Sequence, residues 1–243
     1  MVSRTFDSEE LWGLVEAERI TMVAMVGDAF ARPMLESLDD AAARGRSWDL
    51  SSLRLVLSSG VMFSAPLKQR LLDHHRCTIV DTLGSSEGTG MGRQVTSRSR
   101  NDRGTARFVL GGHTRVFTED GQEVRPGSGE RGRLALGHPL PEGYFKDPAK
   151  TEATFPTIGG RRWSVPGDWA TVEADGSIVL LGRGSECINT GGEKVYPEEV
   201  EEALKVHPAV VDCNVVGVDD ERWGQAVTAV VQLWESAAVD GEA

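Results

Sequence analysis

The chain has 243 residues, of which 40% are hydrophobic and 26% are charged, so it can bury a substantial core and is not compositionally disordered. Its formal net charge of −11 disfavours non-specific binding to nucleic acid or to anionic membranes. Three cysteines without a Cys-x-x-Cys spacing predict neither a disulfide framework nor a structural zinc site. With no apolar signal core and no long apolar run, the sequence predicts a cytoplasmic protein without a membrane or nucleic-acid partner.

The first hundred residues alternate between helical and strand patterns. Apolar spacing predicts helices over 8–18, 28–44 and 67–75, and short apolar runs predict strands over 20–26, 53–57 and 77–81. Ser8 is the expected cap of the first helix. This alternation favours parallel strands with crossover helices, whose ligands bind beyond the carboxyl ends of the strands. We therefore expect two small-residue loops, 58–60 and 84–87, at the same edge of the sheet.

The pattern changes after residue 101 to short strands separated by turns. Strands are predicted over 107–110, 114–118, 133–137 and 178–181, with hairpin-type turns at 119–121 and 174–176. A helix over 197–206 and strands over 210–218 and 226–233 then start another α/β unit. The predicted fold class is α/β: a parallel α/β subdomain over 1–100, a β-rich subdomain over 101–182, and an incomplete C-terminal lid over 183–243.

The stretch from Gly182 to Glu201 has too little periodicity for a core element. Gly191 and Gly192 allow a tight turn or the close approach of a ligand, and Pro197 suits the first position of a helix. The sequence therefore predicts a glycine-hinged functional loop that leads into a helix. The pattern Gly-Arg-x-x-Glu-x-Ile-x-x-Gly-Gly-Glu-x-Val-Tyr-Pro-x-Glu-Val-Glu resembles the interdomain signature of the adenylate-forming acyl-CoA synthetases.

In that family the loop rotates toward the active site, where coenzyme A (CoA) attacks an acyl-adenylate. The resemblance implies a hinge at Ser185 and a CoA-binding role for the loop residues Gly191, Gly192, Glu193 and Lys194. Family hinges often carry Asp or Lys at the position of Ser185, which weakens the inference of a large rotation.

Other motifs are similar to acyl-adenylate-binding motifs of the same family. The resemblance implies contacts to the adenylate from Ser59, Gly60, Asp81, Gly84, Ser86, Asp168 and Arg183. Among these, Ser86 corresponds to the phosphate contact, and Asp168 with Arg183 to the contacts of the ribose. Glu87 corresponds to the Mg²⁺ ligand. A polar turn, a turn aspartate and a surface arginine are the alternative interpretations, and Leu83 stands where the family commonly stacks an aromatic ring on adenine.

The resemblance covers about residues 6–233, yet it matches only the middle of a usual synthetase. The phosphate-cradling loop expected ahead of Met1 and the Gly-Lys segment expected beyond Ala243 have no match in the chain. Adenylation requires electrostatic stabilisation of a triphosphate, whereas thioester formation starts from an activated anhydride and needs mainly positioning. We therefore predict a non-adenylating ligase that converts acyl-AMP and CoA into acyl-CoA and AMP, without a requirement for Mg²⁺ and with a vestigial Glu87.

The same resemblance implies a bulky, diterpenoid-type acyl group, as in a natural-product pathway, supplied as acyl-AMP by a separate adenylating enzyme. Two alternatives stay open at this point: a non-catalytic partner or scaffold of a full synthetase, and a fragment of a complete AMP-forming synthetase. Homo-oligomerisation is also left open.

Overall fold

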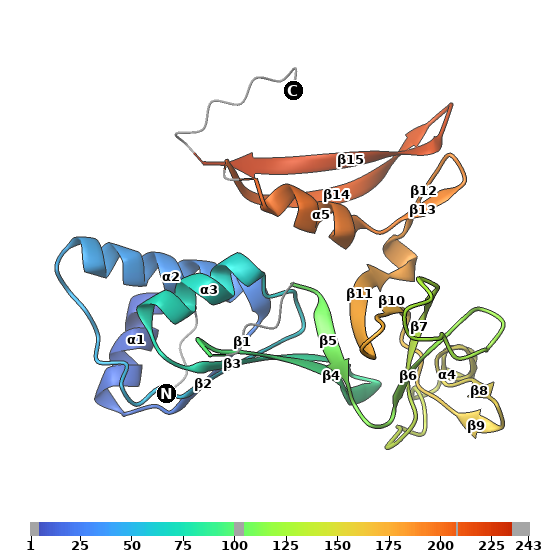
Figure 1. The fold of residues 1–243 in the computed structure, drawn as a ribbon, viewed down its shortest axis with the longest axis horizontal. Helices are drawn as coiled ribbons and strands as arrows, with labels where there is room; N and C mark the ends of the chain where they lie inside the picture. Colours follow the sequence, from blue (N-terminus) through green and yellow to red (C-terminus); the bar gives the residue numbers. More distant parts are fainter. Residues whose placement is uncertain (1–4, 100–104, 208, 235–243) are drawn as a thin grey trace. The chain divides into compact units, whose positions relative to one another are not determined.

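The computed structural model describes residues 5–99, 105–207 and 209–234 (Figure 1). The chain forms two compact units, the first made of Met1–Thr114 and Leu136–Glu142 and the second of Arg115–Ala135 and Gly143–Ala243. The three-part division expected from the sequence stays a prediction.

The first unit begins with alternating helices and parallel strands. Its elements are α1 (Ser8–Ala17), β1 (Met22–Met25), α2 (Gly27–Ala43), β2 (Leu55–Ser59), α3 (Ala65–His74), β3 (Thr78–Ser85), β4 (Gly88–Thr96) and β5 (Arg107–Leu110). Strand β2 pairs in parallel with β1 and β3, while β4 runs antiparallel to β3 and β5. The predicted α/β layer is confirmed, but β4 was missed because its glycines hide the strand pattern.

The core of this unit lies between its helices and the parallel strands. Trp12 is fully buried, and its indole N–H donates to the Met34 carbonyl and to the Ser37 hydroxyl, both at 3.0 Å. Figure 1 shows α2 and α3 side by side over the strands, and Phe63 and Ile79 join the same buried cluster. Truncation of a side chain as large as Trp12 typically costs about 3–5 kcal/mol. No helix within the described residues has the length and apolar character needed to span a bilayer.

The start of α1 corrects one expectation. Asp7, rather than Ser8, is the cap of this helix, and its carboxylate accepts a hydrogen bond from the Glu10 backbone N–H at 2.9 Å. Ser8 is already the first helical residue. Asp is as good a cap as Ser, and the sequence alone did not distinguish the two neighbours.

The second unit contains the β-rich segment. Its elements there are β6 (Thr114–Phe117), β7 (Arg131–Leu136), α4 (Pro148–Thr154), β8 (Thr157–Ile158), β9 (Arg161–Arg162), β10 (Asp168–Val172) and β11 (Ser177–Arg183). The strand order is β11-β10-β7-β6, with β10 antiparallel to both of its neighbours. The β-rich prediction is confirmed, with the short helix α4 added to it.

The lid segment of the second unit is a four-stranded sheet with one helix. After a 3-10 turn at Gly184–Glu186 come β12 (Ile188–Thr190), β13 (Glu193–Val195), α5 (Pro197–Lys205), β14 (Val210–Asp220) and β15 (Gly224–Leu233). The strand order is β13-β12-β15-β14, and α5 packs against β14 over the buried Cys213 and Val215. Pro197 is the first helical residue of α5, as predicted.

Candidate functional site

The two polar loops of the first unit lie at one edge of its sheet. Parallel pairing aligns Ser58 with Asp81 and Ser59 with Thr82, so the ends of β2 and β3 are adjacent. The Ser59 hydroxyl donates to the Thr82 carbonyl at 3.1 Å, and the Thr82 hydroxyl donates to the Ser58 carbonyl at 3.0 Å. Gly60 follows with a φ of 91°, a conformation that L side chains rarely adopt. The parallel pairing that was expected to bring the two loops to one edge of the sheet is confirmed.

The loop predicted over 84–87 is in fact the end of β3 and the tip of a hairpin. Strand β3 extends to Ser85 and turns directly into β4, with Ser85 paired to Gly88. Ser86 and Glu87 form the tip of this hairpin, where the Ser86 hydroxyl donates to the Glu87 carboxylate at 3.0 Å. A Cβ on Gly84 would lie 3.3 Å from the Gly88 carbonyl oxygen, so glycine permits the two strands to approach. Ser86 is exposed at this tip, and Glu87 is half-buried.

Asp81 lies buried in an ion pair, while its expected contact with the adenylate stays a prediction. The side chain of Asp81 is 5% exposed and accepts from the Lys68 ammonium at 2.9 Å, and Lys68 itself is 3% exposed. Lys68 also donates to the Gln94 side-chain oxygen at 2.5 Å. Burial raises the pKa of the Asp81 carboxyl, and the Lys68 charge opposes this shift. The carboxylate is therefore engaged in holding α3 to β3 and β4.

Asp168 and Arg183 are neighbours in the second unit. They are register partners at the start of β10 and the end of β11, and the Arg183 Nε lies 3.5 Å from an Asp168 carboxylate oxygen. Their side chains are 12% and 58% exposed, respectively, so Arg183 keeps N–H groups in contact with solvent. Gly167 precedes the pair with a φ of 110°, and its carbonyl accepts from the Gly184 N–H at 3.0 Å. The proximity expected for a ribose-binding pair is present, while ribose binding itself stays a prediction.

The glycine pair of the lid forms a tight hairpin rather than an irregular loop. Gly191 and Gly192 connect β12 to β13 with φ values of 58° and 88°, the positive values that a two-residue turn requires. The Gly191 N–H donates to the Trp223 carbonyl at 2.9 Å, and a Cβ on Gly191 would meet the Trp223 ring at 3.0 Å. Nothing lies within 4 Å of the corresponding position on Gly192. Within the hairpin, Gly191 therefore packs against Trp223, whereas Gly192 has free space around its Cα.

Lys194 lies over an aromatic surface of its own unit. Its ammonium is 5.5 Å from the centroid of the Trp169 ring and 3.4 Å from the Glu119 carboxylate. Arg131 donates to the Lys194 carbonyl at 3.1 Å and lies over the ring of Tyr196 at 5.7 Å. Lys194 is 52% exposed, so its charge is accessible to an anion. Glu193, also in β13, is exposed.

The hinge region contains a buried carboxyl group that the sequence did not reveal. Ser185 lies in the 3-10 turn Gly184–Glu186, directly after β11. Glu198, at the start of α5, has its Oε2 buried without a hydrogen-bond partner among the described residues, and burial raises the pKa of its carboxyl. A Cβ on Gly182 would lie only 2.0 Å from this oxygen, so only glycine fits there.

Tyr196, the residue before α5, is also buried, and desolvation raises the pKa of its phenol to about 12.

Sequence reasoning missed several residues that shape these sites. Lys68 and Gln94 seal Asp81, Trp169 supports Lys194, and Trp223 fixes Gly191. The position of Lys68 on the apolar side of the predicted helix 67–75 is the one sequence signal that could have indicated its contact with Asp81. The other contacts join residues far apart in sequence, and no local pattern identifies them.

The sequence of this chain matches a known protein family. The sequence pattern of the family described as AMP-binding enzyme matches residues 1–145, and that of the AMP-binding enzyme C-terminal domain matches residues 199–242. The chain therefore belongs to the AMP-binding enzyme family, in the adenylate-forming superfamily.

Its relatives within that family are acyl-CoA ligases. The chain is 46% identical over 95% of its length to the medium/long-chain-fatty-acid–CoA/3-oxocholest-4-en-26-oate–CoA ligase of Mycolicibacterium smegmatis. It is 45% identical over 96% of its length to the 3-oxocholest-4-en-26-oate–CoA ligase of Rhodococcus rhodochrous. The chain spans about 42% of the length of each of these relatives.

Solved structures confirm the fold. The anthranilate CoA ligase AuaEII, in complex with anthranoyl-AMP, superposes with a TM-score of 0.77 at 23% identity, over 96% of this chain and 43% of that one. The amide bond synthetase McbA from Marinactinospora thermotolerans gives a TM-score of 0.79 at 25% identity, over 98% of this chain and 47% of that one. Both values support the predicted arrangement of a parallel α/β layer followed by β-rich segments.

Proposed function

We propose that this chain carries the acyl-adenylate-binding and CoA-side elements of an acyl-CoA ligase. The observation that carries the proposal is the 46% identity to a fatty-acid and steroid-acid CoA ligase over 95% of the chain. The Asp168–Arg183 pair and the Gly191–Gly192 hairpin supply the residue types that such a site needs. The chemistry joins an acyl group to the thiol of CoA with release of AMP.

The proposed substrate is a medium- or long-chain fatty acid or the carboxylate of a steroid side chain. Ligases that are 45–46% identical to this chain are named for such acids, and these names support the proposal better than the diterpenoid acid expected from the sequence. All three acids carry a largely apolar acyl group. An apolar acyl group is therefore proposed, while the diterpenoid identity is not.

In the proposed reaction the chain's residues position reactants. The Asp168 carboxylate accepts hydrogen bonds from the ribose hydroxyls, Arg183 donates to the same sugar, and Ser86 donates to the phosphate. Lys194 attracts a CoA phosphate toward the glycine hairpin. No protein base is assigned, because roughly a few per cent of a free thiol is already thiolate at neutral pH. Burial raises the pKa of the Cys187 thiol, so this cysteine is a poor competing nucleophile.

Glu87 is the proposed Mg²⁺ ligand for the adenylation step. It is a single half-buried carboxylate at a hairpin tip, and Mg²⁺ sites commonly combine one or two carboxylates with phosphate oxygens and water. The residue present therefore fits the ion. When bound, Mg²⁺ would neutralise phosphate charge, and Glu87 would serve only to hold it.

The proposed ligase has two forms, which differ in the half-reactions that they catalyse. The comparisons favour the view that these residues work as part of a complete AMP-forming synthetase, because they match two-fifths of ligases that contain further sequence. A ligase that only forms thioesters, fed by a separate adenylating enzyme, is the second candidate. Thioester formation starts from an activated anhydride and needs mainly positioning of the reactants, a task that suits the binding elements proposed for this chain.

Mass spectrometry tests the chemistry and the two forms of the proposal together. Purified chain is mixed with dodecanoyl-AMP and CoA in one reaction, and with dodecanoic acid, ATP, Mg²⁺ and CoA in another. We expect acyl-CoA above the uncatalysed rate in the first reaction only. No acceleration in the first reaction would contradict the ligase proposal and favour a scaffold role. The intact mass of the native polypeptide then decides between the two forms, since a complete synthetase is longer than 243 residues.

A further inference from the structure

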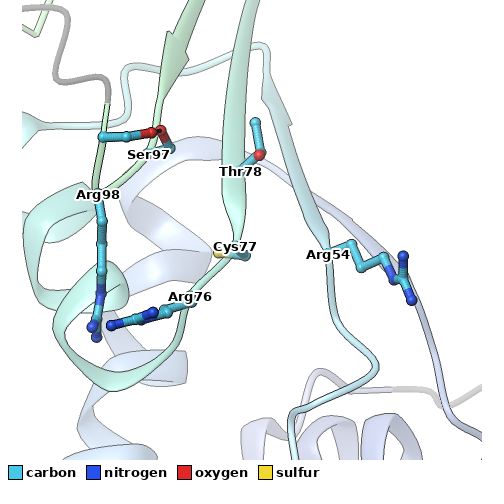
Figure 2. A pocket seen from close by; sticks show the side chains of 7 residues that line it. Arg54, Arg76, Cys77, Thr78, Ser97 and Arg98 are labelled. Carbon is cyan, nitrogen blue, oxygen red and sulfur yellow. Dashed lines mark hydrogen bonds between the residues drawn. The ribbon is translucent and has the colours of Figure 1, made fainter.

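A pocket of the first unit lies at the opposite end of its strands from the loops described above. Its volume is about 510 Å³, and it is lined by Arg54, Arg76, Cys77, Thr78, Ser97, Arg98 and Ser99 (Figure 2). Arg54 precedes β2, Thr78 begins β3, and Ser97 follows β4. Because β3 rises about 3.3 Å per residue, its two ends are roughly 23 Å apart. This arginine pocket is therefore separate from the segments 58–60 and 84–87 of the same unit.

The charge of the arginine pocket is unusual for this chain. Three arginines and no carboxylate line it, although the chain as a whole carries a net charge of −11. Among the described residues, no carboxylate forms an ion pair with Arg54, Arg76 or Arg98. Figure 2 shows the guanidinium groups of Arg76 and Arg98 directed toward each other, with Arg54 on the other side. Adjacent like charges repel, and an anion between them removes the repulsion.

The pocket is held in place by hydrogen bonds of its own. The Arg98 Nε donates to the Leu72 carbonyl at 2.7 Å, and its Nη2 donates to the Asp73 carbonyl at 3.0 Å. These contacts fix the guanidinium against the carboxyl end of α3 and leave its other N–H groups for a ligand. The Thr78 N–H donates to the Arg54 carbonyl at 2.9 Å, which ties the starts of β2 and β3 together. The Arg98 guanidinium is thus held in place before any ligand arrives.

We propose that the arginine pocket binds a phosphomonoester. A phosphate dianion accepts hydrogen bonds in several directions, which suits two converging guanidinium groups and nearby hydroxyls better than a planar carboxylate does. The nearby acid, Asp73, has its carboxylate turned to Gln69, whose side-chain amide donates to it at 2.8 Å. The phosphomonoester comes either from a soluble metabolite or from a phosphatidate headgroup, which share the same chemistry.

The test uses the whole chain and two forms of the same headgroup. Glycerol 3-phosphate is titrated by calorimetry, and phosphatidate-containing vesicles are compared with phosphatidylcholine vesicles in a sedimentation assay. Arg76→Gln is the test variant, because the Arg76 side chain is exposed and forms no ion pair within the described structure. Arg46→Gln removes the same charge from an exposed position outside the pocket and is the matched control.

We expect saturable millimolar or tighter binding that Arg76→Gln weakens about tenfold or more, with Arg46→Gln unchanged. Binding of glycerol 3-phosphate supports a soluble ligand, and binding of phosphatidate vesicles alone supports a headgroup. Absence of saturable binding in both assays would overturn the proposal. Equal weakening by Arg76→Gln and Arg46→Gln would also overturn it, because the effect would then reflect net charge alone. Unchanged melting temperatures confirm that both variants fold.

Discussion

Two acid–base pairs in this protein show how burial separates a structural role from a binding role. Lys68 and Asp81 lie 2.9 Å apart with side chains 3% and 5% exposed. Arg183 and Asp168 lie 3.5 Å apart with side chains 58% and 12% exposed. The first pair is sealed, and its groups are satisfied by each other and by Gln94. The second pair is open, since its Arg183 guanidinium is more than half exposed and can reach a ligand.

The largest expected effect comes from breaking the sealed pair. Lys68→Met leaves the Asp81 carboxylate buried without its cation, which typically costs about 3–5 kcal/mol. Urea unfolding should show this loss in the free energy of unfolding. The double variant Lys68→Met/Asp81→Leu removes both charges and should recover most of it. A loss below about 1 kcal/mol in the single variant would contradict the claim that the pair holds the core.

Breaking the open pair should change binding far more than stability. Asp168→Ala removes a charged hydrogen-bond acceptor, so we expect affinity for a non-hydrolysable acyl-sulfamoyl-adenosine to fall about tenfold to a hundredfold. Loss of the contact with Arg183 should change the free energy of unfolding by only about 1 kcal/mol or less, because Arg183 is more than half exposed. Calorimetric titration and urea unfolding measure the two quantities. Asp120→Ala, at an exposed turn, is the control for binding.

The glycine hairpin also combines a packed position, Gly191, with an exposed one, Gly192, and the expected effects are smaller. Gly191→Ala forces a Cβ to within 3.0 Å of the Trp223 ring, whereas Gly192→Ala places it in open space. Both positions have positive φ, so each substitution carries a backbone strain of roughly 1–2 kcal/mol. Gly191→Ala should therefore destabilise the protein more than Gly192→Ala, as measured by thermal unfolding. Equal destabilisation by the two substitutions would show that the Trp223 ring can move away from the new Cβ without a loss of stability.

The smallest effect concerns the Glu198 carboxyl, which is buried without a partner for its Oε2 among the described residues. Burial raises its pKa in the folded state, so the proton stabilises the fold. This contribution is complete below the unfolded pKa of about 4.3 and is lost as pH rises through the folded pKa. Glu198→Gln should therefore be more stable than the parent at pH 7, with the advantage shrinking toward pH 4. Glu199→Gln, at an exposed neighbouring position, is the control.

Local patterns predicted most elements of the fold but could not separate the two aspartates. Apolar spacing identified the helices and strands of the first unit, and Pro197 marked the start of α5. Asp81 and Asp168 both resembled ligand-binding residues, since each lies in or beside a strand near a small-residue turn. Only the packing of α3 against β3 and β4 reveals that Lys68 covers Asp81. Such long-range contacts leave no trace in local periodicity.

The glycine-rich stretches were predicted less well than the apolar ones. The segments 84–92 and 188–195 form hairpins, although their glycines obscure the alternation that indicates strands. In both cases strand pairing with distant residues stabilises the structure, and the glycines fit turns or close backbone approaches. The hydrogen bond from the Gly191 N–H to the Trp223 carbonyl could not be inferred from the sequence of residues 188–195.

One measurement tests the central claim that the open Asp168–Arg183 pair holds the adenylate ribose. The affinities of acyl-sulfamoyl-adenosine and its 2′,3′-dideoxy analogue are compared for the parent protein and for Asp168→Ala by calorimetry. The account predicts that removing the hydroxyls weakens binding to the parent about tenfold to a hundredfold and has little effect on the variant. The same loss of affinity in both proteins would mean that Asp168 does not contact the ribose, and would contradict the account.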